Sequence, residues 1–203
     1  MADRLRNGDI NVEDKFVLEV GAGTGLSGLV ASRKRAKFVL ITDYNDDSLI
    51  KNLRNNIKLN IDDSNNNNIV KCQPHTWGKD MDDLQFYNQG YEVILAADVI
   101  WDSFSHAMLI ESLVQLLAKK STSRVILVAG YHTGRHVVQA FLRRARAKGL
   151  VPLNDAILEF ERGEYKHTYT SNDFELLDGM VNYDEHREDR QKLLIETQLV
   201  WTC

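Results

Sequence analysis

The chain alternates between short apolar runs and longer stretches in which apolar residues recur every three or four positions. The short runs predict strands at residues 16–20, 37–42, 69–73, 91–97, 124–130, 156–160 and 194–201. The longer stretches predict helices at residues 25–34, 46–60, 105–117 and 135–148. Strands that alternate with helices in this way are typical of an α/β domain with a mainly parallel sheet.

Two polar stretches interrupt this pattern, and both predict loops. Residues 62–68 consist only of Asp, Ser and Asn, and residues 184–192 are mostly charged. Because neither stretch offers apolar side chains to bury, we expect the first to be an insertion before a strand. We expect the second to be a solvated loop before the last strand.

Composition and charge narrow the class of protein. The chain has 203 residues, of which 43% are hydrophobic and 27% are charged, and these values fit one globular domain over residues 1–203. The formal net charge of −4 argues against nucleic acid as the main partner. No apolar stretch reaches the roughly 18 residues of a membrane-spanning helix, so we expect no membrane partner. We also expect a monomer.

The cysteines and the N-terminal residues indicate the cellular compartment in which we expect the protein. Cys72 and Cys203 are too few for a disulfide framework or for a metal site made of cysteines. The first eight residues have no apolar core of the kind that secretion signals carry. We therefore expect a reducing compartment, the cytoplasm, and no bound metal.

A glycine-rich turn is the strongest chemical signal in the sequence. The first predicted strand contains Glu19 and is followed by Gly21, Gly23 and Gly25, at every second position. Glycine lets the backbone approach a ligand with no Cβ in the way. The second predicted strand leads to Asp43, about 20 residues beyond the turn, where a carboxylate can bind both ribose hydroxyls of a nucleoside.

The glycine-rich turn alone does not identify the cofactor. Residues 23–28 also satisfy the G-x-G-x-x-G fingerprint of dinucleotide sites, and a structural turn without a ligand is a further alternative. Glu19 favours S-adenosylmethionine, because a carboxylate would repel a pyrophosphate but suits a ligand with a sulfonium and an amino group.

Further motifs resemble those of a known family. They occupy residues 18–26, 42–44, 52–60, 76–78, 96–101 and 129–135. With them, residues 16–202 resemble the family-16 class I protein methyltransferases, which act on lysine and on N-terminal amines. This resemblance implies a Rossmann-like seven-stranded methyltransferase sheet, parallel except for the last strand, with helices on both faces. Residues 129–135 are most similar to the fungal subgroup that modifies elongation factor 1-alpha, so that factor is the protein substrate we expect.

The resemblance and the strand ends together predict the site residues. We expect the cofactor, S-adenosylmethionine, to be bound by Glu19, Gly21, Gly23, Gly25, Asp43, Tyr44, Trp77 and Ala97. Catalysis is expected of Asp98, which would orient the substrate amine, and of Trp101, whose ring face suits a cation. The mouth for the substrate is expected to be shaped by Tyr131, His132 and Arg135.

The sequence departs from the family pattern at two places. The family's Asp-x-x-Tyr motif reads Asp98-Val99-Ile100-Trp101, so the aromatic face remains and the phenol hydroxyl is gone. Only 15 residues precede the first predicted strand, so we expect an unusually short N-terminal extension.

Three other functions remain open at this stage. One is methylation of a small molecule such as a pyridine amide, and another is binding of the cofactor without catalysis. The third, a dinucleotide oxidoreductase, is disfavoured because no substrate domain follows the nucleotide half of the sheet. The sequence does not identify the methylated position or the number of methyl groups.

Overall fold

The computed structural model describes residues 1–61, 69–79, 81–84, 89–161, 164–177 and 193–202. Its helices are α1 Ala2–Asn7, α2 Leu26–Arg33, α3 Asp47–Asn60, α4 His106–Leu116, α5 Arg135–Ala147 and α6 Ser171–Leu176. Its strands are β1 Phe16–Val20, β2 Phe38–Asp43, β3 Ile69–Pro74, β4 Val93–Ala97, β5 Arg124–Gly130, β6 Leu150–Pro152, β7 Ile157–Glu161, β8 Glu164–Tyr169 and β9 Leu193–Trp201. Two short 3-10 helices span Met81–Leu84 and Leu153–Asp155.

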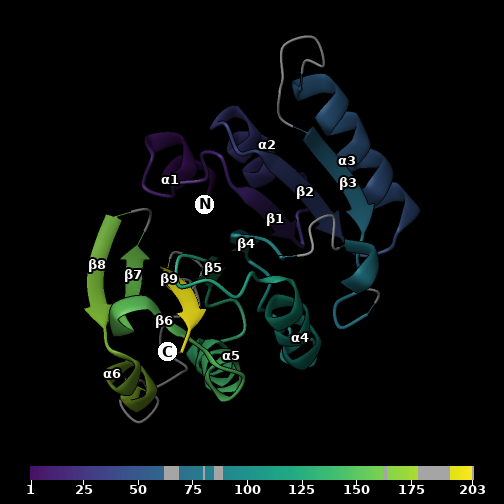
Figure 1. Ribbon diagram of the computed structural model, residues 1–203. Helices are drawn as coiled ribbons and strands as arrows, with labels where there is room; N and C mark the ends of the chain where they lie inside the picture. The colour runs from purple at the N-terminus through teal and green to yellow at the C-terminus, as the bar shows by residue number, and fades with distance from the viewer. Residues whose placement is uncertain (62–68, 80, 85–88, 162–163, 178–192, 203) are drawn as a thin grey trace.

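All the described strands belong to one sheet, in the order β3-β2-β1-β4-β5-β9-β7-β8, and β6 pairs with β9 (Figure 1). The strands from β1 to β5 pair in parallel, with β1 between β2 and β4. The chain runs outward from β1 to β3 and then crosses to β4 on the other side. Ligands of open α/β sheets bind where the strand order reverses in this way, beside the carboxyl ends of the strands.

The two faces of the sheet bury two separate hydrophobic clusters, because side chains alternate along each strand. Leu18, Leu40 and Ile94 belong to the cluster that includes residues of α4, α5 and α6. Val17 and Val39, their immediate neighbours, belong to the cluster that includes residues of α1, α2 and α3. Figure 1 shows these two groups of helices on opposite sides of the sheet, which confirms the expected Rossmann-like architecture with helices on both faces.

The described residues form nine strands, where the sequence predicted seven. The additional strands are β6, which has three residues, and β8. β8 pairs antiparallel with β7, and β7 pairs antiparallel with β9, so β8 runs in the same direction as β9. The last strand, β9, is therefore not the only described strand that runs antiparallel to β1–β5. Neither strand could be predicted, because β6 is too short and β8 is an exposed edge strand whose polar sequence shows no alternation.

The other differences concern short elements and boundaries. Six-residue helices such as α1 and α6 are too short to show a helical period. The strand expected from residue 91 begins at Val93, and Tyr91 instead forms an isolated bridge with Leu117. The polar stretches 62–68 and 184–192 and Cys203 lie outside the described residues. Within the part of the chain that is described, no helix is both long and apolar enough to cross a membrane.

Candidate functional site

A cavity of about 320 Å³ lies at the carboxyl ends of β1, β2, β3 and β4. Its lining comes from the segments that follow these strands and from the beginning of α4. The lining residues are Gly21, Asp43, Tyr44, His75, Thr76, Trp77, Asp98, Val99, Trp101, Ser105 and Met108. Five predicted site residues other than glycine therefore meet in one place, although 58 positions of the sequence separate the first, Asp43, from the last, Trp101.

Gly21 occupies the floor of this cavity and has no room for a side chain. Its φ of 59° lies in the left-handed region. A Cβ built there would lie 2.7 Å from Cγ1 of Val99 and 3.2 Å from Cζ2 of Trp77. The turn after β1 therefore exposes bare backbone to the cavity.

Asp43 joins the second strand to the glycine turn. Its Oδ2 accepts a hydrogen bond from the backbone N–H of Gly23 at 2.6 Å, and its Oδ1 accepts one from the N–H of Tyr44 at 2.6 Å. These bonds fix the carboxylate at the rim of the cavity, beside the exposed Tyr44 ring. A carboxylate in this place can accept hydrogen bonds from the hydroxyls of a ribose.

Glu19 does not lie where the sequence predicted. Its side chain is 2% exposed, and its Oε2 accepts a hydrogen bond from the backbone N–H of Gly28, in the first turn of α2, at 2.8 Å. Burial raises the pKa of this carboxyl to about 7. Glu19 thus fastens β1 to α2 and is not among the described lining residues of the cavity.

Gly23, whose N–H donates to Asp43, and two further cofactor predictions also fall outside the described lining of the cavity. Gly25 is the residue before α2, with φ of 77°, and a Cβ there would lie 3.0 Å from Cδ2 of Leu53. Ala97 ends β4 directly before Asp98. Both residues shape the backbone beside the cavity and do not line it.

The segment after β3 contributes residues that the sequence analysis missed. His75 is buried, and its backbone N–H donates to the carbonyl of Asp43 at 2.7 Å. Its Nε2 lies 3.1 Å from Oγ of Ser112, which accepts a hydrogen bond from the N–H of Gly78 at 2.8 Å. These bonds hold Trp77 between them, against Gly21. The signal available was position alone, because His75 directly follows a parallel strand on the ligand side of the sheet.

Asp98 and His132 form a pair at the other end of the cavity. Nε2 of His132 lies 3.0 Å from Oδ1 and 3.0 Å from Oδ2 of Asp98. Asp98 lines the cavity, whereas His132, which follows β5, is not among its described lining residues. Trp101 lines the cavity as well and is 56% exposed, and its carbonyl accepts a hydrogen bond from Thr133 at 2.9 Å.

The other two predicted substrate-mouth residues are turned away from the cavity, which corrects their assignment. Tyr131 is 2% exposed, and its hydroxyl donates to Oε2 of Glu159 at 2.8 Å. Arg135 forms an ion pair with the same oxygen at 3.0 Å. Burial, together with the charge of Glu159, raises the pKa of Tyr131. These contacts fasten α5 to β7, because the buried Glu159 requires both partners.

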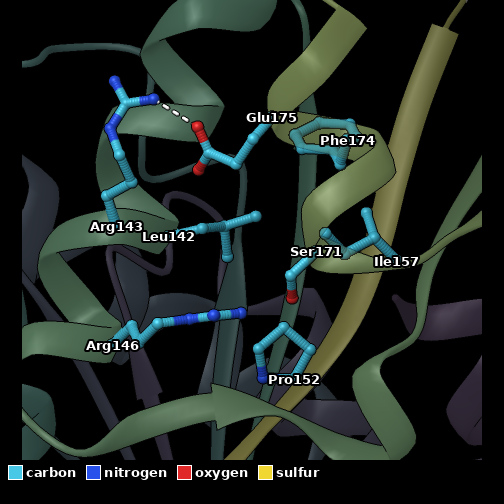
Figure 2. A pocket seen from close by; sticks show the side chains of 8 residues that line it. All are labelled: Leu142, Arg143, Arg146, Pro152, Ile157, Ser171, Phe174 and Glu175. Carbon is cyan, nitrogen blue, oxygen red and sulfur yellow. Dashed lines mark hydrogen bonds and ion pairs between the residues drawn. The ribbon is translucent and has the colours of Figure 1, made fainter.

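A second hollow, between α5, α6 and the 3-10 helix before β7, is much smaller. It measures about 20 Å³, which is room for one water molecule. Figure 2 shows Arg143 and Arg146 beside it, with Arg143 directed to Glu175 and Arg146 pointing toward Ser171. Arg143 is paired with Glu175, and Arg146 lies 3.8 Å from Asp155. Their charges are therefore satisfied within the protein, and we assign this hollow to packing.

The cavity can hold a nucleoside at one end and a cation at the other. Asp43, which ends β2, and Trp77, which follows β3 on the same side of β1, offer a carboxylate and an aromatic face. Asp98 and Trp101, which follow β4 on the other side of β1, offer the same pair of groups. Across the described ranges, no group of three or more His, Cys, Asp or Glu side chains is arranged to hold a metal ion.

Comparison with known proteins agrees with this geometry. The model of a family described as "Lysine methyltransferase" matches residues 2–147. Proteins named protein N-terminal and lysine N-methyltransferase EFM7 are similar to the chain. The one from Candida glabrata is 30% identical over 70% of this chain and 56% of its own length. The one from Neurospora crassa is 31% identical over 69% of this chain and 54% of its own length. The chain spans only 38% of a third, from Cryptococcus neoformans, with 31% identity.

Solved structures share the fold at low identity. A magnesium protoporphyrin IX methyltransferase from Synechocystis with bound SAH superposes with a TM-score of 0.58 and 13% identity, over 99% of this chain and 80% of that one. The tRNA methyltransferase TrmK of B. subtilis superposes with a TM-score of 0.61 and 10% identity, over 100% of this chain and 67% of that one. At these identities the likeness shows the fold alone.

Proposed function

Because this chain belongs to the lysine methyltransferase family, whose model matches residues 2–147, we propose that it transfers a methyl group from S-adenosylmethionine to a protein amine. One observation carries the proposal. A single cavity has Asp43 and the glycine turn at one end and Asp98 with Trp101 at the other. A nucleoside cofactor and a cationic amine can therefore bind in it side by side.

The residues at the first end fit S-adenosylmethionine. Asp43 would bind the ribose hydroxyls and Trp77 would pack against the adenine, because every base has a π-face. Glycine at position 21 lets Val99 and Trp77 pack closely beside the turn, because a Cβ there would collide with Val99 and crowd Trp77. When bound, the cofactor supplies an activated methyl group on a sulfonium, so the protein needs neither a nucleophile nor a metal.

The residues at the second end would bind and orient the substrate. The Asp98 carboxylate attracts an ammonium and directs its nitrogen into the cavity. The exposed ring of Trp101 offers a face to the same cation, a contact worth about 0.5 to 2 kcal/mol. Holding an amine in line with the methyl group is chiefly a proximity effect.

The amine must lose its charge before it can react. A lysine with a pKa of about 10.4 is roughly 0.1% neutral at pH 7.4, whereas an α-amine with a pKa of about 7.8 is roughly 30% neutral. An N-terminal amine is therefore the easier target, and a lysine requires help with its deprotonation. The names of the relatives include both kinds of target.

We further propose elongation factor 1-alpha as the substrate, a monomeric enzyme and a cytoplasmic location. The substrate proposal rests on the similarity of residues 129–135 to the subgroup that modifies that factor. The location rests on the small number of cysteines.

One experiment separates these proposals from the alternatives. The recombinant chain is incubated with S-adenosylmethionine labelled in the methyl group and with a lysate from cells that lack this activity. We expect a labelled protein that mass spectrometry identifies as elongation factor 1-alpha. Label in another protein would contradict only the substrate, label in a small metabolite would favour a small-molecule methyltransferase, and binding without label would favour a non-catalytic protein.

A further inference from the structure

We propose that His132 is the proton outlet of the site: through Asp98 it takes the proton that a substrate ammonium must lose, and it passes that proton to water. The proposal rests on the proposed function and assigns a role to a residue outside the cavity lining.

The two side chains lie in contact beside the cavity, and the Asp98 side chain is itself 57% exposed. Asp98 lines the cavity, where it can accept a hydrogen bond from the substrate nitrogen. Nε2 of His132 is 3.0 Å from both oxygens of that carboxylate. The imidazole is 46% exposed, so water has access to it. Asp98 is the one acidic side chain that the described part of the chain places within ion-pair distance of His132.

The backbone around the pair is shaped to bring the two groups together. Asp98 has φ of 58°, an uncommon conformation for a residue with a side chain, and its N–H donates to the carbonyl of Val128 at 2.7 Å. Gly130 lies directly beneath the imidazole, because a Cβ there would be 2.8 Å from Nε2 of His132. The N–H of Gly130 also points to Oδ1 of Asp98 at 3.4 Å. Strain of this kind is found where a site requires a defined geometry.

The proposed transfer balances in charge and in atoms. Methylation of an ammonium releases one proton overall. The N–H bond of the ammonium breaks while an O–H bond forms on Asp98, and that O–H bond breaks while an N–H bond forms on His132. The imidazolium then gives a proton to water, and the carboxylate is regenerated. The freed lone pair of the amine forms the new N–C bond while the S–CH3 bond of the sulfonium breaks, and the electron pair of that bond stays on the sulfur of the leaving thioether.

A proton outlet at His132 matters more for a lysine amine than for an N-terminal amine. A lysine reaches the site as an ammonium almost without exception, whereas an α-amine is already partly neutral. Loss of the outlet should therefore slow lysine methylation far more than N-terminal methylation. A residue that merely holds Asp98 in place would affect both amines equally.

The test compares His132→Gln with the wild type on recombinant elongation factor 1-alpha. Mass spectrometry counts methyl groups at the N-terminal amine and at lysines separately. Glutamine can still donate a hydrogen bond to Asp98 but cannot accept and release a proton. We expect lysine methylation to fall about tenfold or more and N-terminal methylation to stay within about threefold. The S-adenosylmethionine affinity should be unchanged by calorimetry.

Two more variants make the test specific. Gly130→Ala keeps the imidazole but displaces it from Asp98, so it should show the same selective loss of lysine methylation. His167→Gln, an exposed histidine on the edge strand β8, is the matched control and should behave like the wild type.

The outcomes separate this proposal from the proposed function. Unchanged lysine methylation in His132→Gln, or equal losses at both amines, would overturn the proton outlet and leave the methyltransferase assignment intact. A wild type that labels only the N-terminal amine would also overturn the outlet. A wild type that labels neither amine would overturn the proposed substrate and the outlet together.

Discussion

The carboxylate of Glu19 accepts a hydrogen bond from the backbone N–H of Gly28, inside helix α2, and Glu19 is not among the described lining residues of the cavity. The two residues are closely fitted, because a Cβ on Gly28 would lie 2.7 Å from Oε2 of Glu19 and 2.6 Å from Cγ1 of Ile41. The sequence predicts that Glu19 binds the cofactor, whereas in the structure its carboxylate connects β1 to α2.

This connection predicts a pH dependence of stability. Burial raises the pKa of Glu19 from 4.5 to about 7 in the folded protein. Between these two values the folded protein keeps a proton that the unfolded chain has lost. The stabilisation is complete below pH 4.5 and is lost as the pH rises through 7, and it amounts to about 3 kcal/mol.

Glu19→Gln tests this dependence, because its amide oxygen can still accept the bond from Gly28. In urea unfolding without cofactor, we expect the wild type to lose about 3 kcal/mol relative to Glu19→Gln between pH 4.5 and pH 8. Glu13→Gln, at an exposed position, is the control and should follow the wild type. Parallel curves for the wild type and Glu19→Gln would show that the carboxyl is ionised in the folded protein.

Asp43→Ala should weaken S-adenosylmethionine binding by roughly 1.5 to 3 kcal/mol, because charge-assisted hydrogen bonds to the ribose are lost. The anchor of Gly23 to Asp43 is lost as well. Calorimetry measures the change, and circular dichroism checks the fold. Asp47→Ala, an exposed acid in the first turn of α3, is the control. An unchanged dissociation constant for Asp43→Ala would restrict this residue to a role in the turn.

Asp98→Asn should lower turnover far more than it lowers cofactor affinity, because it removes the charge that faces the substrate and keeps the shape. Trp101→Ala should reduce kcat/KM, whereas Trp101→Tyr should keep most of the activity because an aromatic face remains. Steady-state kinetics with elongation factor 1-alpha as the substrate measure these effects. If both Asp98→Asn and Trp101→Ala stay within about twofold of the wild type, or about 0.4 kcal/mol, the substrate binds elsewhere.

Arg135→Ala should destabilise the protein by about 3 kcal/mol, because it leaves the buried carboxylate of Glu159 without its cation. The comparison variant is Arg143→Ala, on the same helix, whose ion pair with Glu175 is much more exposed. It should cost less than about 1 kcal/mol. Urea unfolding measures both variants. Equal and small effects would show that Arg135 is not a structural partner and would reopen its assignment to the substrate mouth.

The sequence by itself determined the alternation of strands and helices, and it determined which residues follow the strands at the site. Apolar runs must become buried strands, and amphipathic stretches must cover them, so the order from β1 to α5 follows from periodicity. The carboxyl ends of parallel strands meet at one edge of the sheet, so the sequence alone predicts that Asp43 and Asp98 lie close to one site. The edge strand β8 escaped prediction because its exposed side chains carry no pattern.

Only the tertiary structure decided where the side chains point. Glu19 lies near the end of β1, and Tyr131 and Arg135 closely follow β5, yet packing turns these side chains toward Gly28 and Glu159. The pair of Asp98 and His132 joins positions that lie 34 residues apart and depends on the missing Cβ of Gly130. Sequence periodicity assigns a residue to a helix or a strand. The direction of its side chain depends on neighbours from other helices and strands, and only long-range packing brings these neighbours into contact.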